Sequence, residues 1–155
     1  MKRILLRETT PEDAPALAAL LERLPEWFTA EEVETVRAVA ADLPGLAAIN
    51  ENDAVIGFLV WEQRLDEWEI CWIAVAKELH RRGTGQMLLA RMLEQVRESG
   101  VKRVRVKTVA PTVEYEPYAR TRAFYEACGF RLESIQPHGW PDGTDKAEYV
   151  LDLPV

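Results

Sequence analysis

One stretch of the chain decides the fold: residues 71–89, which read CWIAVAKELHRRGTGQMLL. The first residues of this stretch are apolar and predict a buried strand over residues 69–76. A short basic turn follows, with glycines at 83 and 85, and leads into a helix predicted over residues 84–99. Gly100 is typical of a helix C-terminus. The stretch therefore predicts a strand, a glycine-containing turn and a helix in direct succession.

The turn is a candidate pyrophosphate site. Such a turn aims several backbone N–H groups at one point, and the N-terminus of a helix adds about half a positive charge. Arg81 and Arg82 supply further positive charge. The alternative is a tight turn with solvated arginines. The turn is not a Walker A loop, because no Gly-Lys-Ser/Thr follows, and it lacks the third glycine of a dinucleotide-binding motif.

Outward from this stretch, hydrophobic periodicity predicts elements along the rest of the chain. Thr10 and Pro11 indicate a helix start and Pro25 its end, while residues 50–53 are typical of a β-hairpin turn. The predicted strands are 4–7, 46–49, 54–61, 69–76, 101–109, 130–135 and 147–153, and the predicted helices are 11–24, 30–42, 84–99 and 119–128. This β-α-α-β-β-β-α-β-α-β-β order favours a mixed sheet with helices on both faces.

Composition limits the class of protein. A chain of 155 residues, 48% hydrophobic and 29% charged, is expected to form a single domain over residues 1–155. The net charge of −7 disfavours nucleic acid as a partner. No run approaches the roughly 20 apolar residues of a membrane span and no signal peptide is evident, so a cytoplasmic protein is expected. Cys71 and Cys128 indicate free, buried thiols, and without a Cys/His cluster no metal site is expected.

A second motif lies nearer the C-terminus, where residues 120–130 read RTRAFYEACGF. With the strand-turn-helix stretch, it makes the chain resemble the GCN5-related N-acetyltransferase (GNAT) superfamily over nearly its whole length. The resemblance implies an α/β (α+β) fold with a mixed, mostly antiparallel seven-stranded sheet. Strands 4 and 5 would splay around the pantetheine arm of acetyl-CoA. It also implies direct acetyl transfer to a primary amine of an acceptor that the sequence does not identify.

The resemblance assigns the cofactor site position by position. The backbone of residues 73–75 would hold the thioester carbonyl and the pantetheine amides, and residues 80–85 would wrap the pyrophosphate. His80 stands where the family has Gln or Arg, and Tyr118 stands where many members carry an Asn that contacts CoA. The implied set is Ile73, Ala74, Val75, His80, Arg81, Arg82, Gly83, Thr84, Gly85 and Tyr118.

Proton transfer identifies the candidate catalytic residues. An amine with a pKa of about 10 must lose a proton before it attacks a thioester. The family usually supplies a tyrosine as proton donor to the departing thiolate, and Tyr125 matches it, with simple core packing as the alternative. Glu69 is the candidate base if its strand alternates strictly. A β-bulge, also expected to supply an oxyanion-binding N–H near Ile73, would make Glu67 or Trp68 relevant instead, and a water chain is a further alternative.

Aromatic side chains are candidates for the acceptor pocket, because apolar walls exclude water and an aromatic face can stack on a cation. They are Trp27, Phe28, Trp61 and Trp140, with core packing as the alternative and Trp140 the strongest candidate. A non-catalytic module that binds or senses CoA would share the same cradle. An RNA-directed acetyltransferase is disfavoured by the negative charge. Many members of the superfamily form dimers, so a homodimer stays open.

Overall fold

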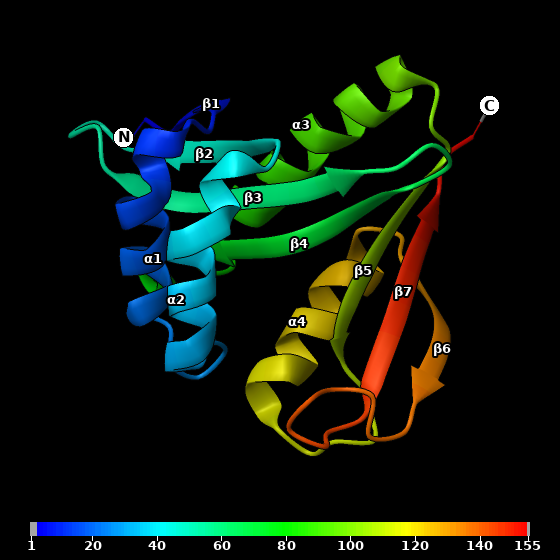
Figure 1. Ribbon diagram of the computed structural model, residues 1–155. Coiled ribbons are helices and arrows are strands. Elements are labelled where there is room, and N and C mark those ends of the chain that lie inside the picture. The colour runs from blue at the N-terminus through cyan, green and yellow to red at the C-terminus, as the bar shows by residue number, and fades with distance from the viewer. Residues whose placement is uncertain (1–2, 155) are drawn as a thin grey trace.

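The computed structural model describes residues 3–154, which form one seven-stranded sheet in the order β1-β2-β3-β4-β5-β7-β6 (Figure 1). The strands are β1 Leu5–Glu8, β2 Gly45–Ile49, β3 Val55–Gln63, β4 Trp68–Val75, β5 Arg103–Val109, β6 Arg131–Gln136 and β7 Lys146–Asp152. The α-helices are α1 Ala14–Glu22, α2 Ala30–Val39, α3 Thr84–Ser99 and α4 Glu116–Ala127. Neighbouring strands are antiparallel except β4 and β5, which run parallel. The predicted mixed, mostly antiparallel sheet is confirmed.

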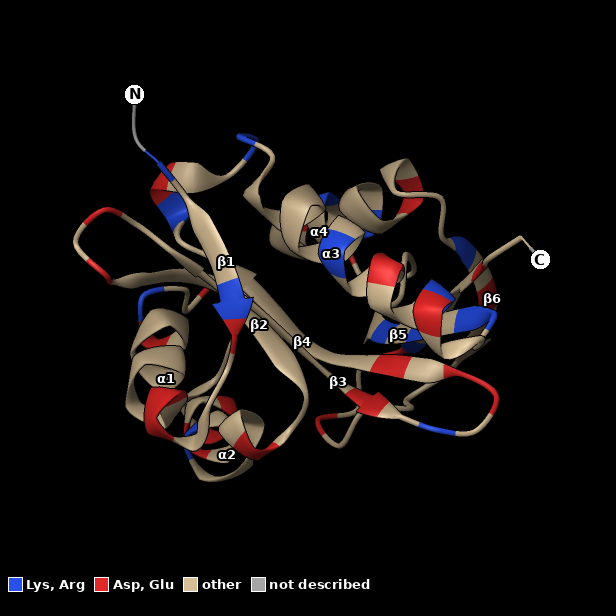
Figure 2. Cartoon of the chain, turned by 90° about the horizontal axis from the view of Figure 1, so that it is seen from above, with Lys and Arg blue, Asp and Glu red and all other residues tan. Residues whose placement is uncertain are grey.

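The helices cover both faces of the sheet, as predicted. Figure 2 shows α1 and α2 on one side and α3 and α4 on the other. Leu17 and Leu20 of α1, and Leu88 and Met92 of α3, are fully buried and form the core with the strands between them. Within residues 3–154, none of the helices has the length and apolar character that a bilayer span requires.

Two local predictions have different outcomes. The hairpin turn at residues 50–53 is confirmed, with Asp53 at a φ of 62°, a left-handed conformation that Asp tolerates. In contrast, α4 begins at Glu116 rather than at residue 119. Proline suits the first turn of a helix, because its missing N–H is not needed there, so Pro117 starts the helix instead of preceding it.

The sheet splits between β4 and β5. Parallel pairing is limited to the pairs Trp68–Val104, Glu69–Arg105 and Ile70–Val106. Beyond Ile70, β4 pairs only with β3, while β5 pairs with β7 along its whole length. Figure 1 shows the V that opens between the two strands. The splaying of strands 4 and 5 that the family resemblance implied is therefore present.

A β-bulge marks the point of divergence. Trp61 pairs with Ile70 and Val60 pairs with Trp72, so Cys71 is the extra residue on β4. The bulge was expected near Ile73 and lies instead at Cys71. The alternation of apolar and polar residues could not locate the bulge. The residues on either side of Cys71 are apolar and suit both registers of the strand equally well.

Candidate functional site

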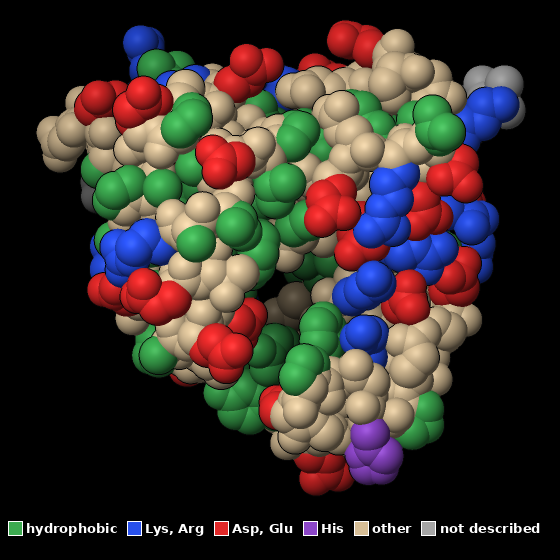
Figure 3. Space-filling model, viewed as in Figure 1, with side chains coloured by type: hydrophobic (Ala, Val, Ile, Leu, Met, Phe, Trp, Pro, Cys, Tyr) green, Lys and Arg blue, Asp and Glu red, His purple; other side chains and the backbone are tan. Residues whose placement is uncertain are grey.

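The gap between β4 and β5 forms the centre of the candidate site. Seen from the side of α1 and α2, the surface is hollowed between α2 and β5 (Figure 3). Residues 71–75 of β4 line one wall and have no strand partner on the β5 side within the described chain. Unpaired backbone N–H and C=O groups need other partners, which makes this edge available to a ligand.

Side chains of the protein satisfy part of the opposite edge. The indole Nε1 of Trp140 donates to the carbonyl of Thr108 at 3.1 Å. Arg122, which is buried, donates from Nη1 to the carbonyls of Val109 at 2.8 Å and Ala110 at 3.2 Å. These contacts occupy the end of β5, so the free backbone groups of the gap lie mainly on β4.

The turn from β4 to α3 has the geometry of an anion site. Gly83, at the N-cap of α3, has a φ of 85°, and a Cβ added there would meet nothing within 4 Å. The hydroxyl of Thr84 is buried and has no hydrogen-bond partner within residues 3–154. Together with the free N–H groups of the first helical turn, this orphan hydroxyl fits a phosphate oxygen.

Arg81 is the strained residue of the turn, with a φ of 65°. A left-handed conformation costs a non-glycine residue about 1 kcal/mol, and such strain is concentrated at functional sites. The side chains of Arg81 and Arg82 are exposed. The turn therefore combines open backbone donors with two positive charges, as the sequence predicted.

The bulge changes the side on which Glu69 lies. Strict alternation placed Glu69 on the side of Ile73, and that placement is wrong. The pairs Glu62–Glu69 and Val60–Trp72 put Glu69 on the same face as Trp72, because residues 60 and 62 of β3 share a face. Ile73 projects to the opposite face.

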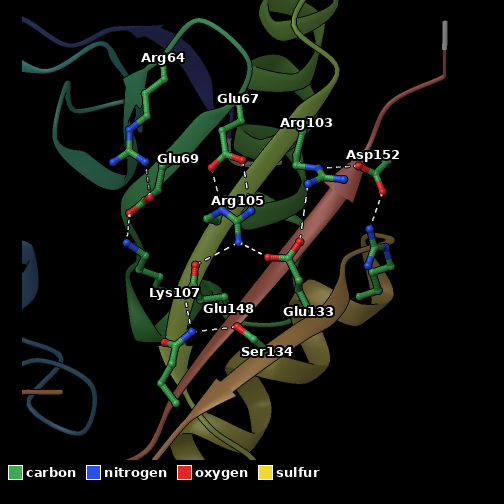
Figure 4. Close-up of polar contacts among 12 residues, drawn as sticks. Arg64, Glu67, Glu69, Arg103, Arg105, Lys107, Glu133, Ser134, Glu148 and Asp152 are labelled. Carbon is green, nitrogen blue, oxygen red and sulfur yellow. Dashed lines mark hydrogen bonds and ion pairs between the residues drawn. The ribbon is translucent and has the colours of Figure 1, made fainter. Parts of the chain in front are cut away.

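Trp68 has no basic side-chain atom, so of the three candidate residues Glu69 and Glu67 remain, and Glu69 is the one held by looser ion pairs. Its Oε1 is buried without a hydrogen-bond partner in the described chain, although it pairs loosely with Arg64 at 3.3 Å. Its Oε2 lies 3.5 Å from Nζ of Lys107 (Figure 4). Trp68 is buried and stacked on Trp61 at 5.8 Å, so these two tryptophans belong to the core.

Glu67, the third candidate, is held by Arg105. The guanidinium donates to both oxygens of Glu67, at 2.7 and 3.2 Å, and these bonds lower the pKa of that carboxyl. The same guanidinium bonds Glu133 at 2.5 Å and Glu148 at 3.0 Å (Figure 4). The bonds to Glu67 and Glu133 raise the pKa of Arg105 further above its already high value. Glu67 is therefore a structural partner of Arg105.

Tyr125 lies on the other side of the gap from Glu69. Val106 pairs with both Ile70 and Tyr149, so these side chains share one face, and the Tyr149 hydroxyl reaches a carboxylate of α4 at 3.5 Å. Tyr125 projects from α4 on this side. Glu69, next to Ile70, points to the face of α1 and α2. Burial raises the pKa of Tyr125, so its phenol stays protonated at neutral pH.

The candidate acceptor residues divide into separate groups. Trp27, in the connection between α1 and α2, contacts α4: its Nε1 donates to the carbonyl of Pro117 at 3.0 Å. Trp140, in the connection between β6 and β7, lies under Nζ of Lys146 at 4.8 Å. Phe28 lines a surface groove of about 320 Å³ between α1 and α2, beside Leu21. Trp140 does not line this groove. Trp27 and Trp140 therefore approach from two different connections, and Phe28 faces a groove of its own.

Sequence reasoning missed one association, that of Trp27 with both His80 and Tyr118. The hydroxyl of Tyr118 donates to the carbonyl of Trp27 at 2.5 Å, and burial raises the pKa of Tyr118 to about 12. The imidazole of His80 meets the indole edge-on at 5.3 Å. These residues are far apart in sequence, and no local pattern indicates their contact. A candidate acceptor residue thus touches two candidate cofactor residues.

The two cysteines are free but only half buried, rather than fully buried as predicted. Burial raises the pKa of Cys71 to about 12 and also raises the pKa of Cys128. The thiolate is the nucleophilic form, so neither thiol is activated for covalent catalysis. No group of His, Cys, Asp and Glu within residues 3–154 is arranged to hold a metal ion.

Fold and site together define an α/β protein with a ligand gap in its sheet and an anion-binding turn beside that gap. The family model described as "Acetyltransferase (GNAT) family" matches residues 6–130, and the chain belongs to this family. It is therefore an acyltransferase, and the resemblance deduced from the sequence is confirmed.

Known relatives agree with this assignment. The chain is similar to the [ribosomal protein bS18]-alanine N-acetyltransferases of Salmonella typhimurium, at 26% identity over 108 residues, and Escherichia coli, at 27% over 109 residues; each match covers 69% of both chains. A crystal structure of a GNAT-family acetyltransferase from Desulfovibrio desulfuricans superposes with a TM-score of 0.87 at 26% identity, covering 98% of this chain and 100% of that one. The fold is also that of the NatC complex solved with Gag peptide and CoA, at a TM-score of 0.77 and 13% identity, covering 98% and 99%.

The raised pKa of Cys71 predicts an unreactive thiol. In a Cys128→Ser background, alkylation of native protein by iodoacetamide at pH 7 should be roughly a hundredfold or more slower than alkylation of the unfolded chain. The rate should rise with pH up to about 12, because deprotonation then supplies the thiolate. Mass spectrometry of timed samples measures it. Rapid alkylation of native protein at pH 7 would contradict the prediction.

Proposed function

We propose that this chain transfers the acetyl group of acetyl-CoA directly to a primary amine. The observation that carries the proposal is the split of β4 from β5 after Ile70, directly before a turn with an open N-terminus at Gly83. The orphan hydroxyl of Thr84 and the positive charges of Arg81 and Arg82 fit a pyrophosphate. The presence of CoA in a structural neighbour of the same fold supports this ligand.

The residues of the gap have distinct roles in this proposal. The backbone edge of residues 73–75 that faces β5 would hold the pantetheine amides, apart from the Val75 carbonyl, which lies 2.8 Å from Nε2 of His80. Residues 80–85 would hold the pyrophosphate. The N–H of Ile73 would stabilise negative charge on the thioester carbonyl oxygen. Acetyl-CoA supplies an activated acyl group, and side chains of the protein would accept and donate the protons.

Protons would be handled from opposite faces of the gap. Glu69, on the face of α1 and α2, would hold the acceptor ammonium and take its proton, directly or through water. Tyr125, on the side of α4, would keep a proton available for the departing thiolate. This separation suits a direct transfer, because the amine that adds to the acyl carbon and the thiolate that leaves it each need a proton-transferring group of their own. The raised pKa values of both cysteines give independent support, since an acyl-cysteine intermediate needs a thiolate.

The proposed acceptor class is a primary amine. The relatives are named for acetylation of the alanine of a ribosomal protein, which supports a protein α-amine as one acceptor. Arg120 lies over the ring of Trp27 and Lys146 over that of Trp140, so an acceptor cation would have to displace these side chains to stack there. Small primary amines undergo the same reaction and are a second class of acceptor.

A thiol-release assay tests the function. Purified protein is incubated with acetyl-CoA and an amine panel that includes a peptide beginning with alanine, a polyamine and free amino acids. Release of CoA thiol with at least one amine, and acetylation of that amine by mass spectrometry, is expected. Saturable CoA binding without thiol release across the panel would favour the non-catalytic CoA-binding module. Failure to bind CoA would contradict the proposal altogether.

The Tyr125→Phe variant tests the proton donor. Loss of the hydroxyl should lower kcat by roughly a hundredfold or more, while the Kd for CoA changes less than about twofold. Tyr149→Phe is the matched control, because Tyr149 is also buried and also bonds α4, yet has no role in the reaction. Equal kcat in Tyr125→Phe and the parent would remove Tyr125 from the mechanism.

The Gly83→Val variant tests the phosphate cradle. A branched side chain would fill the open space at the N-terminus of α3, so the Kd for CoA should rise by about tenfold or more in calorimetric titration. Gly100→Val is the control: Gly100 has a φ of 84°, close to the 85° of Gly83, and equally open surroundings at the other end of α3. The control should lose stability and keep its CoA affinity. Unchanged affinity in Gly83→Val would refute the cradle.

A further inference from the structure

We propose that Trp27 holds the mouth of the gap in its binding shape, and that His80 and Tyr118 support CoA binding by fixing Trp27 rather than by touching CoA. The three residues are called the mouth bridge below. The inference rests on the proposed function, because it concerns the affinity for CoA. It reassigns two residues that the family resemblance places in the cofactor site.

One half of the mouth bridge joins Trp27 to the N-terminus of α4. The indole Nε1 donates to the carbonyl of Pro117 at 3.0 Å, and the hydroxyl of Tyr118 donates to the carbonyl of Trp27 at 2.5 Å. These bonds run in opposite directions between the same two segments. The hydroxyl of Tyr115 adds a bond to the carbonyl of Glu26 at 2.7 Å. The connection between α1 and α2 is thus fastened to α4, which packs on β5.

The other half joins Trp27 to the end of β4. The ring of His80 packs edge-on against the indole, with centroids 5.3 Å apart. Its Nε2 lies 2.8 Å from the carbonyl of Val75, the last residue of β4. Glu26 forms an ion pair with Lys77, directly after the strand. The same short segment therefore contacts both sides of the V, one through β4 and one through α4.

The position of these contacts explains why they matter. β4 and β5 share no ladder bonds after Ile70, so the strands themselves do not set the width of the opening. Trp27 spans that opening through His80 on one side and Tyr118 on the other. A site that is already in its binding shape loses less conformational freedom when a ligand binds, which raises affinity without a new contact.

The chemistry of His80 and Tyr118 points the same way. The Nε2 of His80 and the hydroxyl of Tyr118 already have protein partners. His80 packs its ring on the indole of Trp27 and bonds the carbonyl of Val75, and Tyr118 bonds the main-chain carbonyl of Trp27. Polar groups that already bond within the protein have less capacity to bond CoA, so a role through Trp27 fits both residues better.

A double-mutant cycle on CoA affinity separates the two roles. The variants are His80→Ala, Tyr118→Phe and the double variant, and the Kd for CoA is measured by calorimetry at a temperature where circular dichroism shows all of them folded. If both residues act through Trp27, each single variant should weaken binding about fivefold, and the double variant should be little weaker than either single. Trp27→Phe, which keeps an aromatic ring but loses the N–H donor, should weaken binding by a similar factor.

A second pair provides the control. Arg81→Ala combined with Tyr118→Phe should show fold-changes that multiply, because the charge of Arg81 acts independently of the mouth bridge. Multiplying fold-changes for His80 and Tyr118 would overturn the inference, since they would indicate two separate contacts with CoA. Unchanged Kd values in both single variants would also overturn it. Absence of CoA binding by the parent protein would instead contradict the proposed function.

Discussion

The loss of hydrogen bonding between β4 and β5 after Ile70 is the constraint on which the site depends. The bulge at Cys71 inserts one residue into β4, and from there the strand follows β3 while β5 follows β7. Buried backbone groups without partners are costly, so an unfilled split would destabilise the sheet. The chain pairs part of the exposed edge with Trp140, Arg122 and His80. The backbone groups that stay unpaired belong to a short segment of β4. The length of this segment limits how much of an extended ligand can pair with the sheet.

The same split would let the two proposed catalytic groups act from two sides. In an intact sheet, side chains on opposite faces are separated by the backbone layer and cannot reach a common atom. Where the strands part, that layer is open. Glu69 lies just before the split on the face of α1 and α2, and Tyr125 is buried on α4, on the other face. The register therefore matters as much as the residue types. A one-residue shift of β4 would exchange Glu69 with a core side chain.

Much of this architecture could be predicted from local sequence. The order of elements, the hairpin after Ile49 and the turn at Gly83 each depend on residues close together in the chain. Arg103, Arg105 and Lys107 alternate with buried valines and threonine, so the local sequence also accounts for the polar face of β5. The start of α4 was missed because Pro117 is equally compatible with a loop and with a first helical turn.

Long-range contacts could not be predicted in this way. The association of Trp27 with Tyr118 joins segments 91 residues apart, and neither residue type specifies a partner. The position of the bulge depends on how β4 packs against β3 rather than on the composition of β4. The partners of Arg105 come from three other strands or turns and are likewise invisible in a single sequence.

The polar face of β5, β7 and β6 has a consequence for how an acceptor arrives. Along this face the positive side chains already have carboxylate partners: Arg105 has three, and Arg103 and Arg131 share Asp152 (Figure 4). Paired charges cancel beyond a few ångströms, so the face projects little field into solvent. This face would therefore attract an incoming amine only weakly at long range. Selection would take place at close range, through the shape of the site and contacts with aromatic rings. Long-range attraction for the amine would then come from the net charge of −7 on the whole chain, and added salt would weaken it.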